Sequence, residues 1–167
     1  MKWRFANTID CAHTDRVLQH VARPGEVLAE IHRVLRPGGR IVLAEPDWDT
    51  LIIDYPDLLV ARAYTRFVTD IVVQNACIGR QLAGMAKRSG FDVAKVIPVT
   101  TVFEDVSEAD KIFGIYRLTE RAVAAGYMEA DAAQVLINYL AIAPFFASVT
   151  LFITIGSIPR EEKTVFD

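Results

Sequence analysis

Apolar side chains recur along this chain in two spacings, one typical of helices and the other typical of strands. After Pro24 they fall on one face of a helix, at Val27, Leu28, Ile31, Val34 and Leu35. The continuous apolar run from Ile41 to Ala44 is typical of a strand that is covered on both faces. Thr8 to His13 forms a further short strand before the helix. Strand, helix and strand in this order predict a right-handed crossover unit, with the helix ending at Pro37-Gly38-Gly39.

The rest of the chain continues the alternation of helices and strands. Helices are predicted over Asp57 to Asn75, Arg80 to Ser89, Ser107 to Gly126 and Glu129 to Ala143. Ser107, with Asp110 three residues on, is expected to cap the third of these. Strands are predicted over Val93 to Phe103, where Pro98 requires an edge position or a bulge, and over Ser148 to Ile158. The absence of repeats and linkers in the sequence predicts one domain over residues 1–167, with an ordered core over 1–159 and a polar tail over 160–167.

Composition excludes some classes of partner. The 167 residues carry a net charge of −3 without a basic cluster, so neither nucleic acid nor an anionic membrane surface is expected as a partner. The segment from Ala132 to Pro159 lacks charge and is long enough for a membrane span. Asn138 and Pro144 divide it, however, and its second half alternates like a strand, so no membrane insertion is predicted. Cys11 and Cys77 could pair, but without a recognisable signal peptide they are predicted to be two buried thiols in a reducing cytoplasm.

Three neighbouring strings of residues carry a resemblance to a known family. They are Asp15 to Val21 (DRVLQHV), Val27 to Gly39 (VLAEIHRVLRPGG) and Ile41 to Trp48 (IVLAEPDW). Together they are similar to the fourth through fifth strands of class I S-adenosylmethionine-dependent methyltransferases, of the small-molecule type that includes ubiquinone and menaquinone biosynthesis enzymes. The resemblance implies a Rossmann-like α/β fold. In that family the strand order is 3-2-1-4-5-7-6, so we expect a truncated version here: a four-stranded mixed sheet in the family order 4-5-7-6 with flanking helices.

The resemblance also implies S-adenosylmethionine as the cofactor. The family's glycine-rich turn and its ribose-binding acidic residue have no counterpart in this sequence, because Gly38-Gly39 follows a helix and precedes a strand. We therefore expect cofactor binding by this chain alone to be weak or absent. Several lost hydrogen bonds of about 1–2 kcal/mol each would move a micromolar dissociation constant beyond the millimolar range.

Two clusters of polar residues follow the predicted parallel strands, where ligands of open α/β sheets bind. The resemblance implies that the cofactor contacts Ala12, His13, Thr14, Asp15 and Arg16, and that the substrate contacts Glu45, Asp47 and Trp48. Structural roles are the alternatives. Asp15 and Arg16 would supply a helix cap and a surface or buried ion pair, for which Glu45 is a candidate partner. Trp48 would then serve only in ordinary packing. His13 or His20 could act as a base or serve only as a hydrogen-bonded structural side chain, so the catalytic residue is unassigned. No spacing of ligand residues predicts a metal site.

Three functions stay open at this point. The chain is expected to be a methyltransferase-like protein that is inactive alone. Alternatively, it works as an enzyme with a separately encoded N-terminal half or with a site built in a dimer, or it is a non-catalytic relic or module that binds a small apolar ligand. The methyl acceptor is not predicted. Because the strand near Ile9 and Cys11 would lie at an edge without a proline or lysine to protect it, a homodimer through this strand is predicted.

Overall fold

A computed structural model describes residues 6–160 of the chain. Its strands are β1 (Ile9–Asp15), β2 (Leu35–Ile53), β3 (Asp92–Phe103) and β4 (Ala147–Ser157). Its α-helices are α1 (Pro24–Val34), α2 (Leu58–Phe67), α3 (Ile78–Arg88), α4 (Val106–Phe113), α5 (Ile115–Ala124) and α6 (Ala130–Ile142). A 3₁₀ turn, η1 (Leu18–His20), follows β1, and a π-helical turn, η2 (Val68–Val72), continues α2. Except for Arg160, the predicted polar tail lies outside the described residues.

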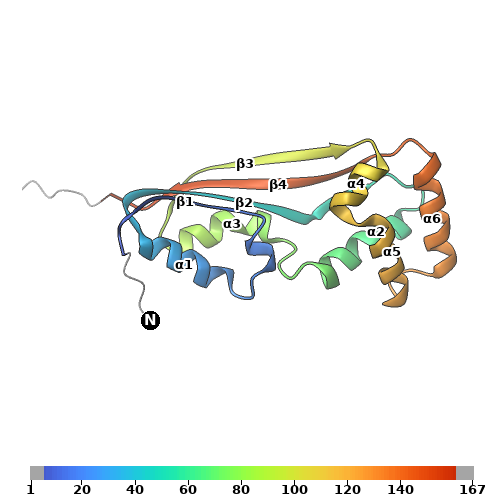
Figure 1. Ribbon diagram of the computed structural model, residues 1–167, viewed down its shortest axis with the longest axis horizontal. Helices are drawn as coiled ribbons and strands as arrows, with labels where there is room; N and C mark the ends of the chain where they lie inside the picture. Colours follow the sequence, from blue (N-terminus) through green and yellow to red (C-terminus); the bar gives the residue numbers. More distant parts are fainter. Residues whose placement is uncertain (1–5, 161–167) are drawn as a thin grey trace, which may run out of the picture.

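The four strands form one mixed sheet in the order β1-β2-β4-β3 (Figure 1). β1 runs parallel to β2, and β4 runs antiparallel to both of its neighbours. Ile41 pairs with Gly156, which places the apolar run of β2 beside the last strand as expected. The predicted α/β fold with the sheet order 4-5-7-6 is therefore confirmed.

The helix that precedes β2 ends earlier than expected. α1 stops at Val34, and Pro37-Gly38-Gly39 lies within β2 instead of terminating the helix. The reason is steric: a residue before proline is disfavoured in the helical region, so Arg36 is already extended. The glycine pair then meets the end of β4, where the Gly38 N–H donates to the carbonyl of Ile158 (3.1 Å).

Only one face of β2 is covered by helices in the described part of the chain. α3 packs across β2, β4 and β3, and Ile41 and Leu43 on that face are completely buried. Val42 points to the opposite face and is 39% exposed. The prediction that the run from Ile41 to Ala44 is covered on both faces is therefore wrong for the described residues.

The predicted helix from Ser107 to Gly126 is two helices. Gly114 has φ +62°, a left-handed conformation that ends α4 and begins α5. The cap is also misassigned in the sequence prediction. Asp105 caps α4, because its carboxylate accepts hydrogen bonds from the Glu108 N–H (2.9 Å) and from the Ser107 hydroxyl (2.5 Å).

The uncharged segment from Ala132 to Pro159 is largely divided between α6 and β4, as its pattern predicted. Among the described residues, no helix is long and apolar enough to cross a membrane. Pro98 lies in β3, an outer strand of the described sheet that pairs with β4 and carries a register shift between Val93 and Lys95. The other outer strand of the described sheet is β1, and the homodimer through it stays a prediction.

The apolar core consists of two clusters on either side of an irregularity in β2. One cluster, around Leu18, Leu28 and Leu82, lies between the sheet and helices α1 and α3. The other surrounds Tyr64 and Leu136 and joins α2, α5 and α6 to the far end of β2. Between them the β2–β4 register shifts, from Asp47 to Ile52. Side chains at this junction face both halves of the molecule and define the candidate site.

Candidate functional site at the carboxyl end of strand β1

The buried carboxylate of Glu45 holds the turn that follows β1. Glu45 is fully buried in β2, and its side chain accepts hydrogen bonds from three successive backbone N–H groups: Val17 at 2.8 Å, Leu18 at 2.6 Å and Gln19 at 3.3 Å. Three N–H groups at the start of a helical turn would otherwise lack partners. Glu45 therefore fixes the path of the chain as it leaves the carboxyl end of β1.

Asp47 holds the first turn of α3 in place through hydrogen bonds, as Glu45 holds the turn after β1. It is also fully buried, and it accepts hydrogen bonds from the Asp49 N–H (3.2 Å) and the Arg80 N–H (3.2 Å). The guanidinium of Arg80 pairs with Asp47 through Nε and through NH2 (2.8 Å), and it reaches Asp49 at 3.0 Å. Burial, with the negative charge of Asp47 nearby, raises the pKa of the neighbouring Cys77 thiol.

Trp48 connects the two loops at the strand ends. Its indole Nε1 donates to Gln19 Oε1 (2.7 Å), and Gln19 Nε2 donates to the Arg16 carbonyl (3.3 Å). The ring packs edge-on against Phe113 with the centroids 6.2 Å apart. The side-chain amide of Asn75 stabilises η1, because its Nδ2 donates hydrogen bonds to the carbonyls of Leu18 (2.9 Å) and Val21 (2.7 Å).

A cleft of about 550 Å³ opens beside this network. Apolar side chains of η2 and of α4 and α5 form much of its wall, and Trp48, Gln19 and His20 close the side nearest β1. Its ionisable residues are His20, Asp110, Lys111 and Arg117. Asp110 accepts a hydrogen bond from the Tyr116 N–H (3.0 Å). Pockets of a few hundred cubic ångströms with a few polar groups in an apolar wall are typical of small-molecule sites.

The predicted cofactor residues lie along β1 and just after it. Ala12 packs on the helix-covered side of the sheet, whereas His13 and Asp15 are exposed. Asp15 and Arg16 form an exposed ion pair with each other (2.9 Å) rather than with Glu45. Arg16 has φ +54°, an uncommon conformation for a residue with a side chain.

Each of the three predicted substrate residues has a partner within the described chain. The carboxylates of Glu45 and Asp47 are occupied by the hydrogen bonds given above, and only Trp48 lines the cleft. Their assignment to substrate, like that of the β1 residues to cofactor, stays a prediction.

Several residues that shape the cleft have no signal in the sequence. Gln19 lies 29 residues before Trp48, the predicted residue that it contacts, and α4 and α5 contribute Lys111 and Arg117 from a much later part of the chain. These side chains meet only after the sheet and helices have packed together. The sequence indicated a ligand site here only through the polar residues that follow β1, and of these His20 lines the cleft.

Comparison with known proteins shows that the chain is similar to methyltransferases. Residues 4–43 match the family model of the methyltransferase domain. The crystal structure of "a putative methyltransferase" from Bacillus halodurans C-125 superposes with a TM-score of 0.59 at 12% identity, over 95% of this chain and 68% of that one. The resemblance to methyltransferases is therefore confirmed, and the described chain has the Rossmann-like methyltransferase fold.

A relative of higher identity comes from Streptomyces fradiae. It is an uncharacterized 37.1 kDa protein in transposon TN4556, 60% identical over 149 residues. The match covers 89% of this chain and 43% of the relative, so the chain spans less than half the length of that protein.

Proposed function

We propose that this chain forms the acceptor-binding part of an S-adenosylmethionine-dependent methyltransferase. The observation that carries the proposal is the position of the cleft, which opens beside the carboxyl end of β1 within the methyltransferase fold. Ligands of open α/β sheets bind outside the carboxyl ends of the strands. β1 itself lies within the segment that matches the methyltransferase-domain model.

The residues at the end of β1 fit the methionine end of the cofactor. The hydroxyl oxygen of Thr14 is buried and has no hydrogen-bond partner among the described residues, so it can bond to a ligand. The backbone at Arg16 turns sharply away at this point, as its left-handed conformation requires. Ala12, His13, Thr14, Asp15 and Arg16 would border the cofactor here.

The neighbouring cleft would hold the methyl acceptor. When bound, S-adenosylmethionine supplies a methyl group on a positively charged sulfur, and transfer breaks the sulfur–carbon bond as the acceptor's bond to that carbon forms. Trp48 would hold the acceptor and exclude water, and positioning of this kind supplies much of the rate of such a transfer. His20 lines the cleft and could take the proton that the acceptor loses. No residue is assigned as catalytic.

For the 167-residue chain alone we expect no tight cofactor binding. The family's glycine-rich turn is not part of this sequence, and the contacts expected of it would come from elsewhere. Calorimetry with S-adenosylhomocysteine is expected to give a dissociation constant weaker than about 1 mM. Saturable binding at micromolar concentration would contradict this and would favour the alternative of a site completed in a dimer.

A further inference from the structure

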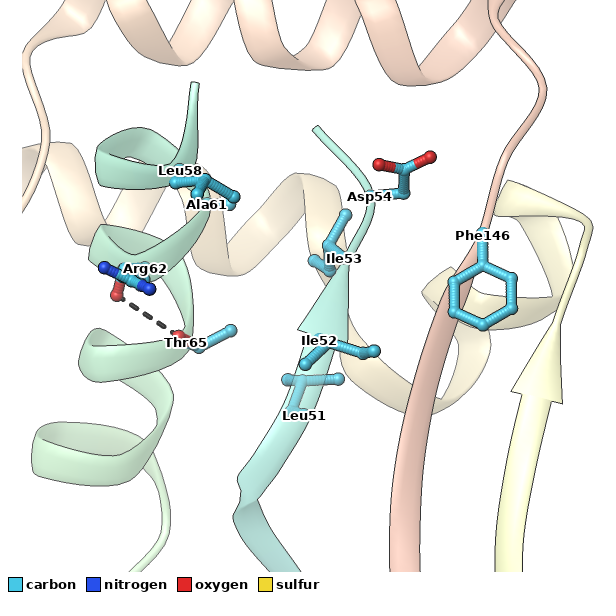
Figure 2. Close-up of a pocket in the computed structure, with 9 residues that line it drawn as sticks. All are labelled: Leu51, Ile52, Ile53, Asp54, Leu58, Ala61, Arg62, Thr65 and Phe146. Atoms are coloured by element: carbon cyan, nitrogen blue, oxygen red, sulfur yellow. Dashed lines mark hydrogen bonds between the residues drawn. The ribbon is translucent and has the colours of Figure 1, made fainter. Parts of the chain in front are cut away.

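A second pocket lies between α2 and the far end of β2 (Figure 2). It is an open groove of about 420 Å³ and shares no lining residue with the cleft beside Trp48. We call it the α2 groove. Two thirds of its lining residues are apolar, namely Leu51, Ile52, Ile53, Leu58, Ala61 and Phe146.

Three of the six apolar residues that line the α2 groove are exposed to solvent. Leu51, Ile53 and Ala61 are buried, but Ile52 is 54% exposed and Leu58 is 59% exposed. Phe146, on the other side of β2 from α2 in Figure 2, is 37% exposed. An apolar ligand in the groove would cover these exposed side chains, whose contact with water is unfavourable.

The polar groups of the α2 groove are separated from one another. Figure 2 shows Arg62 on α2 and Asp54 beyond the end of β2, on opposite sides of the groove. Among residues 6–160, Arg62 takes part in no ion pair. Arg66, one turn further along α2, lines an adjoining pocket together with Arg62. Arg62 is therefore the single cation, and Asp54 the single anion, among the residues that line the α2 groove.

We propose that the α2 groove binds an amphiphile with an unbranched apolar chain and one anionic head group of the carboxylate class. The chain would cover Ile52, Leu58 and Phe146, and the carboxylate would meet the guanidinium of Arg62, whose paired N–H groups match two carboxylate oxygens. Asp54 on the opposite side disfavours a second negative charge on the ligand. This site is independent of the methyl-transfer proposal because its residues are different.

Calorimetry of the full chain with dodecanoate, below its micelle-forming concentration, tests the proposal. Saturable one-to-one binding is expected. Because each buried methylene is worth about fourfold in affinity, decanoate, which is two methylenes shorter, is expected to bind about fifteenfold more weakly than dodecanoate. Equal or tighter binding of dodecyltrimethylammonium would overturn the assignment of an anionic head group. No binding of dodecanoate, or binding that does not depend on chain length, would overturn the site itself.

Two variants localise the binding. Arg62→Gln is expected to weaken dodecanoate at least tenfold, since hydrogen bonds to a charged group are lost, while Arg88→Gln at the end of α3 leaves it unchanged. Thr65→Trp adds an indole to the groove from α2 and is expected to block binding. Wild-type affinity in both Arg62→Gln and Thr65→Trp would place the ligand elsewhere and contradict the proposal.

Discussion

Replacing Glu45 by alanine is expected to lower the free energy of unfolding by about 3–5 kcal/mol, because each backbone donor left without a partner costs about 1–3 kcal/mol. The Glu45 carboxylate is completely buried and is the acceptor for three backbone N–H groups of the turn after β1. Alanine would leave these donors without that acceptor, next to a cavity. Urea denaturation followed by circular dichroism measures the change.

Two further variants show whether hydrogen bonding at Glu45 is responsible. Glu45→Gln keeps one accepting oxygen, so a smaller loss of about 1–2 kcal/mol is expected. Glu120→Ala removes an exposed carboxylate from α5 and should change stability by no more than about 0.5 kcal/mol. If Glu45→Ala were as mild as Glu120→Ala, the role given to the Glu45 carboxylate would be wrong.

The second large effect is expected at Gly79, in the first turn of α3. A Cβ atom at this position would lie 2.8 Å from the carbonyl oxygen of Glu45 and 2.9 Å from the amide nitrogen of Asp47. Both are backbone atoms of β2, which cannot move aside without shifting the strand. Gly79→Ala is therefore expected to destabilise the protein by about 1–3 kcal/mol, in spite of alanine's better helix propensity.

Gly84, in the middle of the same helix, is the matched control. A Cβ there would lie 3.2 Å from the flexible end of the Arg88 side chain, which can move. Gly84→Ala should raise stability by up to about 1 kcal/mol, because alanine is the better helix former. Urea denaturation followed by circular dichroism measures both variants. A stabilising Gly79→Ala would show that α3 does not depend on its close approach to β2.

The spacing of apolar residues predicted correctly those helices and strands that bury one face of the element and expose the other. The apolar positions after Pro24 gave α1, in which Leu28 is completely buried, and the alternation after Ser148 gave β4. The order of the strands came from the resemblance to methyltransferases, since periodicity does not determine which strands are neighbours.

The errors in the prediction have local physical causes. Ser107 was expected to cap α4, but Asp105, two residues earlier, accepts the capping hydrogen bond from the Glu108 N–H, and the Ser107 hydroxyl donates to Asp105 as well. The break at Gly114 depends on a left-handed backbone conformation, which glycine permits but does not require. Burial of both faces of β2 was inferred from the continuous apolar run of residues 41–44, and the exposure of Val42 shows that an apolar residue in a strand need not be covered.

The site was harder to predict because its interactions are distant in sequence. Glu45 bonds to residues 26 to 28 positions earlier, and Asp47 bonds to Arg80, 33 positions later. From the sequence alone these two carboxylates were candidate ligand groups. In the folded chain they hold the loops on which Trp48 and His20 reach the cleft.

An NMR titration tests the position of the cofactor and acceptor sites most directly. Spectra of ¹⁵N-labelled protein would be recorded as S-adenosylmethionine is added, to several times the expected dissociation constant of about 1 mM or more. The account predicts that the largest shifts occur at the backbone amides from Ala12 to Arg16 and at the indole N–H of Trp48, increasing without saturation through the micromolar range. Shifts centred on another part of the molecule, such as α6 or the α2 groove, or shifts that saturate at micromolar concentration, would contradict it.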